Sequence, residues 1–317
     1  MAITVSNENF VRAESDRMFA SLQAVAGGVN RWHHSKAPTA IDEQTVIRMN
    51  RDTLYSMAVV DLSRGANVTI PEAAGRYLSV MVVNQDHYVN KILHDPGEYS
   101  LTVEEIGTPF ALLVARVLVD PSDPADIERV NVVQDGFSLT AVSARPFVMP
   151  DYDGDSFTAT REAVLEEARR GGGLKQTHGV FGTKAEVDPV RHRIGTAMGW
   201  GGLPETEATY VSEEPGLPVG AYRITVKDVP VDGFWSITVY NKAGFFEKNL
   251  QGVYSVNNIT GVPDDDGSVT VHLGGDEDQP NHIPLPEGWN YLVRLYRPRP
   301  EILDGTWTFP TLETADR

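Results

Sequence analysis

Cysteine is absent from the 317 residues, which excludes disulfide bonds and every mechanism that uses a thiolate. Long apolar runs are absent as well. The longest, Phe110–Val119, is interrupted by Arg116 and is far shorter than the ~20 residues of a membrane-spanning helix. The first ten residues have neither the basic nor the apolar region of a signal peptide. We therefore expect a soluble, cytoplasmic protein without a membrane partner.

Basic residues are scarce relative to acidic ones. The chain has 27 Lys and Arg against 44 Asp and Glu, so its formal net charge is −17. A negative field of this size repels phosphate groups, which argues against nucleic acid as a partner. The partners that remain are a small-molecule ligand and further copies of the chain, which would form a homo-oligomer through apolar β-surfaces.

Common catalytic signatures are also missing. We find no Gly-x-Ser-x-Gly elbow, no glycine-rich phosphate loop and no His-Glu-x-x-His pair. No cofactor can be assigned from the sequence.

Alternation of apolar and polar residues dominates the stretch from Gly220 to Arg297. This period of two is typical of half-buried β-strands, and it predicts strands at residues 222–226, 234–240, 268–273 and 291–296. Asp-Gly and Gly-Gly turns lie between them. Short strands separated by such turns indicate an antiparallel β-sandwich or jelly roll.

The length of the chain predicts more than one domain. Strands are expected at 54–62, 77–84 and 110–120, and helices at 7–26 and 188–200. We predict an N-terminal β-domain with a leading helix at 1–148, a helical connector at 149–205 and a C-terminal β-domain at 206–317.

Several motifs resemble the paired DUF1254/DUF1214 family of domains of unknown function. The first domain is similar at Asn50-Arg-Asp-Thr-Leu-Tyr-Ser56, Asp61-Leu62 and Gly75-Arg-Tyr77. The second is similar at Phe234-Trp-Ser-Ile-Thr-Val-Tyr240, Tyr254, Asp266-Gly-Ser268, Asn281 and Leu292-Val-Arg-Leu-Tyr-Arg-Pro298. The resemblance implies an immunoglobulin-like N-terminal β-domain and a jelly-roll-like C-terminal β-sandwich with a few packing helices. It implies no established chemistry.

Polar residues near one strand form the candidate site of the first domain. Asp52, Asp61 and Tyr55 are candidate catalytic residues, and Asn50 and Arg76 are candidate ligand-binding residues. If they share a strand face, they could line a pocket for a polar molecule. Alternatively, Asp52 and Arg76 form a structural pair that fixes the start of a strand.

Arg294 is the candidate catalytic residue of the second domain. Tyr240, Asn241 and Tyr296 are candidate ligand-binding residues beside it. A guanidinium flanked by tyrosines can hold a carboxylate bidentately. The alternative is a core arginine whose donors are satisfied by the protein.

Tryptophan offers a further ligand-binding hypothesis. Trp235, with Trp200 and Trp289, could form a platform that stacks on sugars. The alternative is that all three pack in the core.

An acidic segment gives a weak metal candidate. Asp151, Asp153, Asp155 and Glu162 have the offsets of positions 1, 3, 5 and 12 of a calcium loop, but the glycine stands at position 154 instead of the sixth position. The alternative is a solvated acidic linker.

Two functions follow from these candidates. The first is an enzyme, hydrolase- or lyase-like, that acts on a small polar or carboxylated molecule in an interdomain cleft, where Asp52 or Asp61 would meet Arg294 or Tyr240. The second is a non-catalytic module that binds a ligand or glycan. Since a fold does not fix a function, the sequence leaves both open.

Overall fold

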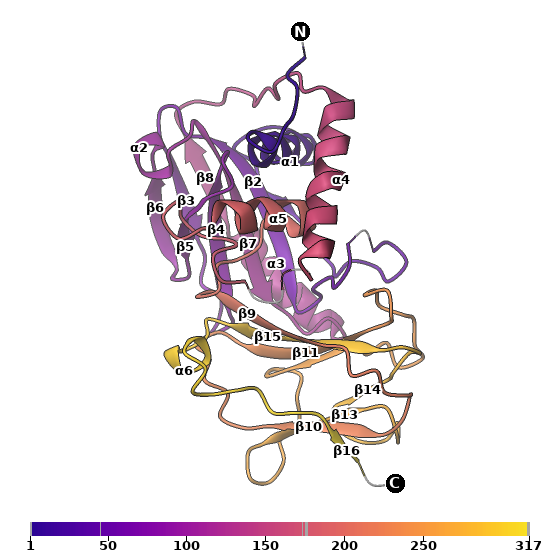
Figure 1. Ribbon diagram of the computed structural model, residues 1–317. Helices are drawn as coiled ribbons and strands as arrows, with labels where there is room; N and C mark the ends of the chain where they lie inside the picture. The colour runs from indigo at the N-terminus through magenta and orange to yellow at the C-terminus, as the bar shows by residue number, and fades with distance from the viewer. Residues whose placement is uncertain (1, 45, 173, 175–176, 316–317) are drawn as a thin grey trace. The chain divides into compact units, whose positions relative to one another are not determined.

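The computed structural model describes residues 2–44, 46–172, 174 and 177–315. Over these residues the protein is mainly β, with several antiparallel sheets and few helices (Figure 1). This confirms the fold class predicted from the sequence. The immunoglobulin-like and jelly-roll assignments stay predictions.

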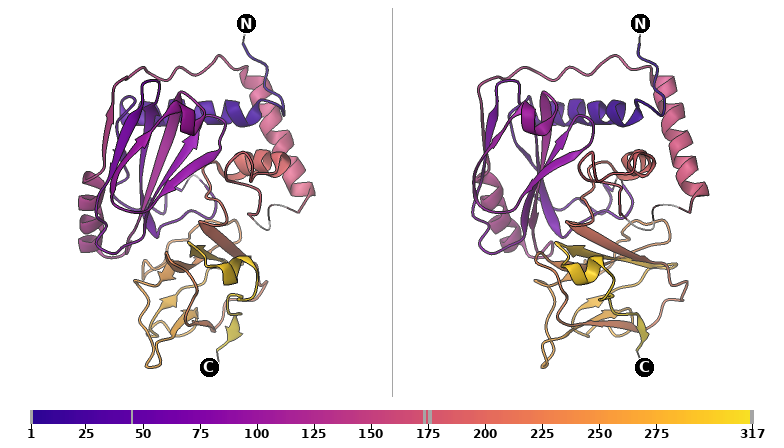
Figure 2. Two further views of the ribbon diagram at one scale, coloured as in Figure 1. Left: turned by 90° about the vertical axis from the view of Figure 1, so that its left-hand side faces the viewer. Right: turned by 60° about the vertical axis from the view of Figure 1, so that its left-hand side comes forward.

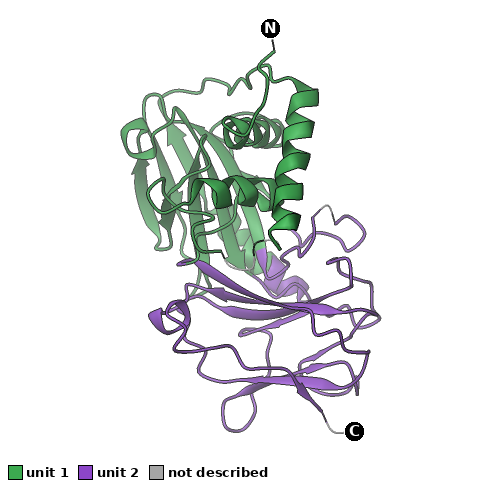
Figure 3. Cartoon of the chain, viewed as in Figure 1, with its two compact units in different colours: residues 1–36, 54–118, 128–205 green, residues 37–53, 119–127, 206–317 purple. Residues whose placement is uncertain are grey.

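The chain forms two compact units, and each is assembled from separated stretches (Figure 3). Unit 1 comprises residues 1–36, 54–118 and 128–205, and unit 2 comprises residues 37–53, 119–127 and 206–317. The stretch 149–205, expected as a connector, lies in unit 1. Residues 37–53 lie in unit 2, although the sequence placed them within the first domain.

Unit 1 contains two sheets. The five-stranded sheet has the order β1 (His33–His34), β2 (Thr53–Asp61), β7 (Phe110–Leu118), β4 (Leu78–Asn84), β5 (Val89–Leu93). The three-stranded sheet has the order β6 (Gly97–Leu101), β3 (Ala66–Ile70), β8 (Ser138–Ala141). Every residue of β4 is buried, and β4 pairs antiparallel with both neighbours. This is the behaviour expected of a strand that is apolar on both faces.

Three helices of unit 1 pack against one another: α1 (Phe10–Ala26), α4 (Gly154–Arg170) and α5 (Pro189–Gly199) (Figure 2). They share a small core made by Phe10, Val164 and Ala197. The shorter helices are α2 (Val103–Ile106) and α3 (Pro124–Asp135), and α3 begins at a proline, whose missing backbone N–H is harmless at the first helical position. None of the helices in the described part of the chain has the length and apolar character to cross a membrane.

A glycine inside α5 marks a close contact in this helical layer. A methyl group at Gly195 would lie 2.3 Å from Cγ1 of Val180, whereas Gly199 of the same helix has open space around it. Alanine normally stabilises a helix relative to glycine by about 1 kcal/mol. We expect Gly195→Ala to lower the free energy of unfolding by about 1 to 3 kcal/mol, because overpacking outweighs helix propensity.

Gly199→Ala is the matched control for this prediction. It should leave the free energy of unfolding unchanged or raise it slightly. Urea denaturation followed by circular dichroism measures both variants. Equal effects of the two substitutions would contradict the packing at position 195.

Unit 2 contains two four-stranded sheets. The first has the order β12 (Ser255–Asn257), β11 (Trp235–Tyr240), β15 (Asn290–Tyr296), β9 (Ala208–Glu213). The second has the order β14 (His282–Ile283), β13 (Val269–Leu273), β10 (Tyr222–Val226), β16 (Glu313–Thr314), and the short helix α6 (Pro300–Leu303) follows β15. Side chains from both sheets, among them Ile224, Trp235, Val271 and Val293, form one core. The four strands predicted from alternation are therefore confirmed as β10, β11, β13 and β15.

Candidate functional site

The face of the β12-β11-β15-β9 sheet that lies opposite the core is polar. Every second residue of β11 belongs to the core, so Ser236, Thr238 and Tyr240 face the other way. The antiparallel register places Asn257 of β12 and Arg294 of β15 opposite Ser236. All five side chains are buried. Buried polar groups in this number require partners or a ligand.

Arg294 is 2% exposed, and its guanidinium is held by the protein. Nη1 donates to Oγ1 of Thr238 at 2.8 Å, and Nη2 donates to the Tyr240 hydroxyl and to the Arg48 carbonyl, both at 2.8 Å. The Tyr240 hydroxyl donates in turn to the Met49 carbonyl at 2.7 Å. This arrangement matches the alternative of a satisfied core arginine more closely than a free carboxylate clamp.

The charge states of this pair follow from their surroundings. Burial acts to lower the pKa of Arg294, but Tyr240, Tyr296 and Asp52 outweigh it and raise the pKa above its ordinary value. Burial raises the pKa of Tyr240, although Arg294 acts in the other direction. Arg294 is therefore a permanent cation, and Tyr240 is a neutral phenol at neutral pH.

Asp52 lies in the same cluster and has one unsatisfied oxygen. Its Oδ1 accepts hydrogen bonds from Oγ of Ser255 at 2.9 Å and from Nδ2 of Asn257 at 3.2 Å. Its Oδ2 is buried and has no hydrogen-bond partner among the described residues, and the same holds for Oγ of Ser236. We call Asp52, Ser236, Tyr240, Asn257 and Arg294 the polar cluster.

Asn50 and Arg51 lie beside the polar cluster and are only half-buried. Oδ1 of Asn50 accepts the backbone N–H of Asp52 at 2.9 Å, and its Nδ2 donates to the Tyr296 hydroxyl at 3.2 Å. The Arg51 guanidinium lies 5.7 Å from the ring centroid of Tyr254. Asn50 and Arg51 are thus the partly exposed residues that precede the buried Asp52 in the chain.

Two family descriptions match the two parts of the sequence that supply this cluster. "Protein of unknown function (DUF1254)" matches residues 29–98, and "Protein of unknown function (DUF1214)" matches residues 213–300. The chain thus carries both members of the DUF1254/DUF1214 pair. Asp52 comes from the DUF1254 match, whereas the other four members of the cluster come from the DUF1214 match.

Solved structures support the same fold. The VPA0106 protein from Vibrio parahaemolyticus is similar at 17% identity, with a TM-score of 0.75 and coverage of 98% of each chain. An uncharacterized protein from Burkholderia cenocepacia is similar at 14% identity, with a TM-score of 0.53 and coverage of 96% of this chain and 87% of that chain. No curated protein matches. At these identities the likeness concerns the fold alone.

Asp61, also in the DUF1254 match, belongs to unit 1. Its Oδ2 accepts from Oγ of Ser143 at 2.6 Å and from the backbone N–H of Arg145 at 2.8 Å, and its Oδ1 accepts from the backbone N–H of Ser63 at 3.0 Å. Burial acts to raise the pKa of Asp61, but hydrogen bonds from Ser143, Ser63 and Arg145 hold it well below its usual range. A carboxylate held in this way is a poor base, so these contacts favour a structural role for Asp61 over the catalytic role that we predicted.

Tyr55 and Arg76 also belong to unit 1. The Arg116 guanidinium lies 5.4 Å from the ring centroid of Tyr55, and Nη1 of Arg76 donates to the Leu118 carbonyl at 3.3 Å. They are not part of the polar cluster in unit 2.

Trp235 and Asn241 both lie within the DUF1214 match, and their side chains are engaged in the core and in a turn, respectively. Trp235 and Trp289 are 6% and 2% exposed and belong to the core of unit 2. Oδ1 of Asn241 accepts the backbone N–H groups of Ala243 and Phe245, which closes a turn. The burial of Trp235 matches the alternative that the tryptophans pack in the core more closely than the sugar-stacking prediction.

The acidic segment begins a helix instead of forming a calcium loop. Asp153 is the N-cap of α4 and accepts the backbone N–H of Ser156 at 2.8 Å. Asp155 and Glu162 lie within that helix, about 10 Å apart along its axis at 1.5 Å per residue. In the described parts of the chain, no three His, Cys, Asp or Glu side chains are grouped as a metal site.

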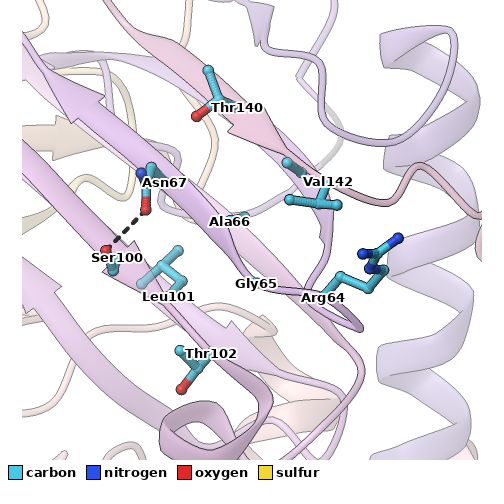
Figure 4. A pocket seen from close by; sticks show the side chains of 10 residues that line it. Arg64, Gly65, Ala66, Asn67, Ser100, Leu101, Thr102, Thr140 and Val142 are labelled. Atoms are coloured by element: carbon cyan, nitrogen blue, oxygen red, sulfur yellow. Dashed lines mark hydrogen bonds between the residues drawn. The ribbon is translucent and has the colours of Figure 1, made fainter.

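A shallow hollow of about 390 Å³ lies in unit 1, beside strands β3, β6 and β8 (Figure 4). Asn67, Ser100, Thr102 and Thr140 are among its lining residues, and Oγ of Ser100 donates to Oδ1 of Asn67 at 2.9 Å. Arg64 is the one charged residue in the described lining, and it is exposed. The hollow offers no acid-base pair.

Two members of the polar cluster, Ser236 and Asn257, were missed from the sequence, and so were their neighbours Thr238 and Ser255, which hydrogen-bond to Arg294 and Asp52. A signal for Ser236 was present, since it interrupts the apolar strand Phe234–Tyr240. Ser255 and Asn257 lie in a three-residue strand, which is too short to show alternation.

Proposed function

We propose that the protein binds a small, uncharged, hydroxylated molecule at the polar cluster of unit 2, with Asp52 accepting a hydrogen bond from the ligand. The observation that carries this proposal is the buried Oδ2 of Asp52, which has no partner among the described residues. Leaving such an acceptor unsatisfied costs about 1 to 3 kcal/mol, which a ligand hydroxyl would offset.

Ser236 supports a hydroxylated ligand. Its Oγ is also buried and unsatisfied within the described residues, and a serine hydroxyl can both donate and accept. A molecule with two neighbouring hydroxyl groups could serve both Asp52 and Ser236.

The charges of the cluster favour an uncharged ligand. Arg294 is close enough to Asp52 for the two charges to interact, so the cluster is nearly neutral. The bonds of Arg294 to Thr238, Tyr240 and the Arg48 carbonyl occupy its two terminal nitrogens. A carboxylated ligand would therefore have to compete with the protein acceptors that both terminal nitrogens already serve.

Binding without catalysis fits the cluster better than hydrolase- or lyase-like chemistry. Acid-base catalysis needs two groups positioned for proton transfer. Tyr240 keeps its proton at neutral pH and uses it on the Met49 carbonyl, so it is available neither as base nor as acid.

Saturation-transfer NMR with small probes tests the proposal. Xylitol and glucose serve as uncharged polyols, and succinate serves as a carboxylated comparator. We expect saturation transfer from the wild-type protein to the polyols and none to succinate. Asp52→Asn keeps the size of the side chain but changes its hydrogen-bonding capacity, so affinity should fall about 5- to 150-fold.

Two further variants make this test specific. Ser236→Ala should weaken the polyol signal, whereas Asp42→Asn should not, because Asp42 is exposed and pairs with Lys248 in the same unit. Circular dichroism checks that each variant folds. The proposal fails if succinate binds in place of the polyols, if no probe binds, or if Asp52→Asn behaves as wild type.

A further inference from the structure

The second sheet of unit 2 has the strand order β14-β13-β10-β16 (Figure 1). The strand register aligns four ionisable residues in a row across it. The register places Glu313 opposite Arg223, Arg223 opposite His272, and His272 opposite His282. The row thus includes one residue from each strand of the sheet. It lies on a different sheet from the polar cluster.

The two histidines of this row are neighbours on one face. Leu273 and Ile283, which follow them along β13 and β14, belong to the core. Side chains alternate along a strand, so His272 and His282 point away from the core. β13 and β14 run parallel, and paired residues of neighbouring strands lie about 4.8 Å apart. The two imidazoles therefore start side by side from adjacent backbones.

Neither imidazole is engaged with the protein. Within the described residues, His272 and His282 make no side-chain hydrogen bond or ion pair, and Nε2 of His282 is buried without a partner. Arg223 donates instead to Glu313 at 3.1 Å. A buried imidazole nitrogen without a partner calls for water or an ion.

Carboxylates surround the pair. Asp264 acts electrostatically on His272, while Glu277 and Asp276 act on His282. The opposing charge is Arg223, which Glu313 partly neutralises. The surroundings therefore favour a cation.

We propose that His272 and His282 bind one divalent transition-metal ion of the Zn²⁺, Ni²⁺ or Cu²⁺ class, with water completing its coordination. Imidazole nitrogen selects these ions over Mg²⁺ and Ca²⁺, which take oxygen ligands. Two neighbouring imidazoles can converge on an ion at the usual Zn–N distance of about 2.0 to 2.1 Å.

Metal binding needs the neutral form of imidazole. The test is therefore made at pH 7.5, above the ordinary histidine pKa of about 6.5.

Calorimetric titration of the untagged, EDTA-treated full chain with ZnCl₂ at pH 7.5 tests the site. We expect one ion per chain for the wild type. His272→Ala and His282→Ala should each weaken binding at least about tenfold, the lower end of the loss when even a supporting residue of a metal site is removed. His178→Ala, at an exposed histidine paired with Glu205 in unit 1, should bind as wild type.

A charge variant adds a prediction of opposite sign. Arg223→Ser removes the positive charge opposite His272 and should tighten Zn²⁺ binding by up to about tenfold, the size of a Coulomb interaction between a unit charge and a divalent ion across about 6 Å in water. The proposal is overturned if the wild-type chain does not bind Zn²⁺, if both alanine variants bind like wild type, or if Arg223→Ser leaves the affinity unchanged.

Discussion

Arg294→Met lowers the free energy of unfolding by about 3 to 5 kcal/mol, the usual cost of removing one member of a buried charged pair. The guanidinium is the donor for Thr238, Tyr240 and the Arg48 carbonyl. Its loss leaves these acceptors buried, and it leaves Asp52 without the positive charge beside it. Urea denaturation of the full chain measures this loss.

Two other variants define the cause. Arg299→Met removes an exposed arginine that pairs with Asp232 and should cost less than about 1 kcal/mol. Arg294→Lys keeps the charge but loses the planar guanidinium, so it should still cause most of the loss in unfolding free energy that Arg294→Met causes. If Arg294→Met and Arg299→Met are equally mild, Arg294 does not fasten residues 48–49 to the sheet.

Acidification from pH 7 to pH 5 should destabilise unit 1 through two buried histidines. Nε2 of His87 accepts the Gly201 N–H, so Nδ1 carries the proton and donates to Thr196. The His87 ring stacks on Trp200 and lies 5.0 Å from the ring of His192. A proton added to either ring would be a buried charge without a counterion.

The sign of this pH effect follows from the pKa values. Burial lowers the pKa of His87 well below its ordinary value and lowers that of His192 as well. Below about pH 6.5 the unfolded chain therefore binds protons that the folded chain does not. The free energy of unfolding falls with a slope that approaches about 1.4 kcal/mol per pH unit for each histidine. Most carboxylates titrate near pH 4, below this window.

Denaturation at pH 7, 6 and 5 checks this slope. His87→Asn and His192→Asn should each flatten it, and asparagine tolerates the φ of +64° at position 87. His178→Ala, at an exposed histidine, should leave the slope as in wild type. An unchanged slope in the double variant of His87 and His192 would assign the pH effect to other groups.

Much of the fold was predictable because the main strands show the alternation of apolar and polar residues within their own sequence. Tyr222–Val226 and Val269–Leu273 alternate along their whole length, and both form strands whose bounds lie within one residue of those predicted. By contrast, β12 and β14 have three and two residues, so their conformation depends on a neighbouring strand instead of on local pattern. The outer strand Gly97–Leu101 is mostly exposed and has no regular apolar face.

The candidate site was predictable in its residue types but not in its grouping. Asp52 and Arg294 were both selected from the sequence, yet as parts of two separate domains. Their proximity depends on residues 37–53 belonging to unit 2, and no pattern in the nearby sequence indicates this. The hydrogen-bond partners of Asp61 could not be predicted for a similar reason, because Ser143 and Arg145 lie more than 80 residues away in the sequence.

The interleaved path of the chain limits how the protein can be divided. Residues 206–317 expressed by themselves would lack the strand-flanking peptide that supplies the Met49 carbonyl and Asp52. Tyr240 and Arg294 would then lose the carbonyl acceptors of Met49 and Arg48 to which they donate. A truncated or transplanted form of unit 2 must therefore include residues 37–53 together with residues 206–317.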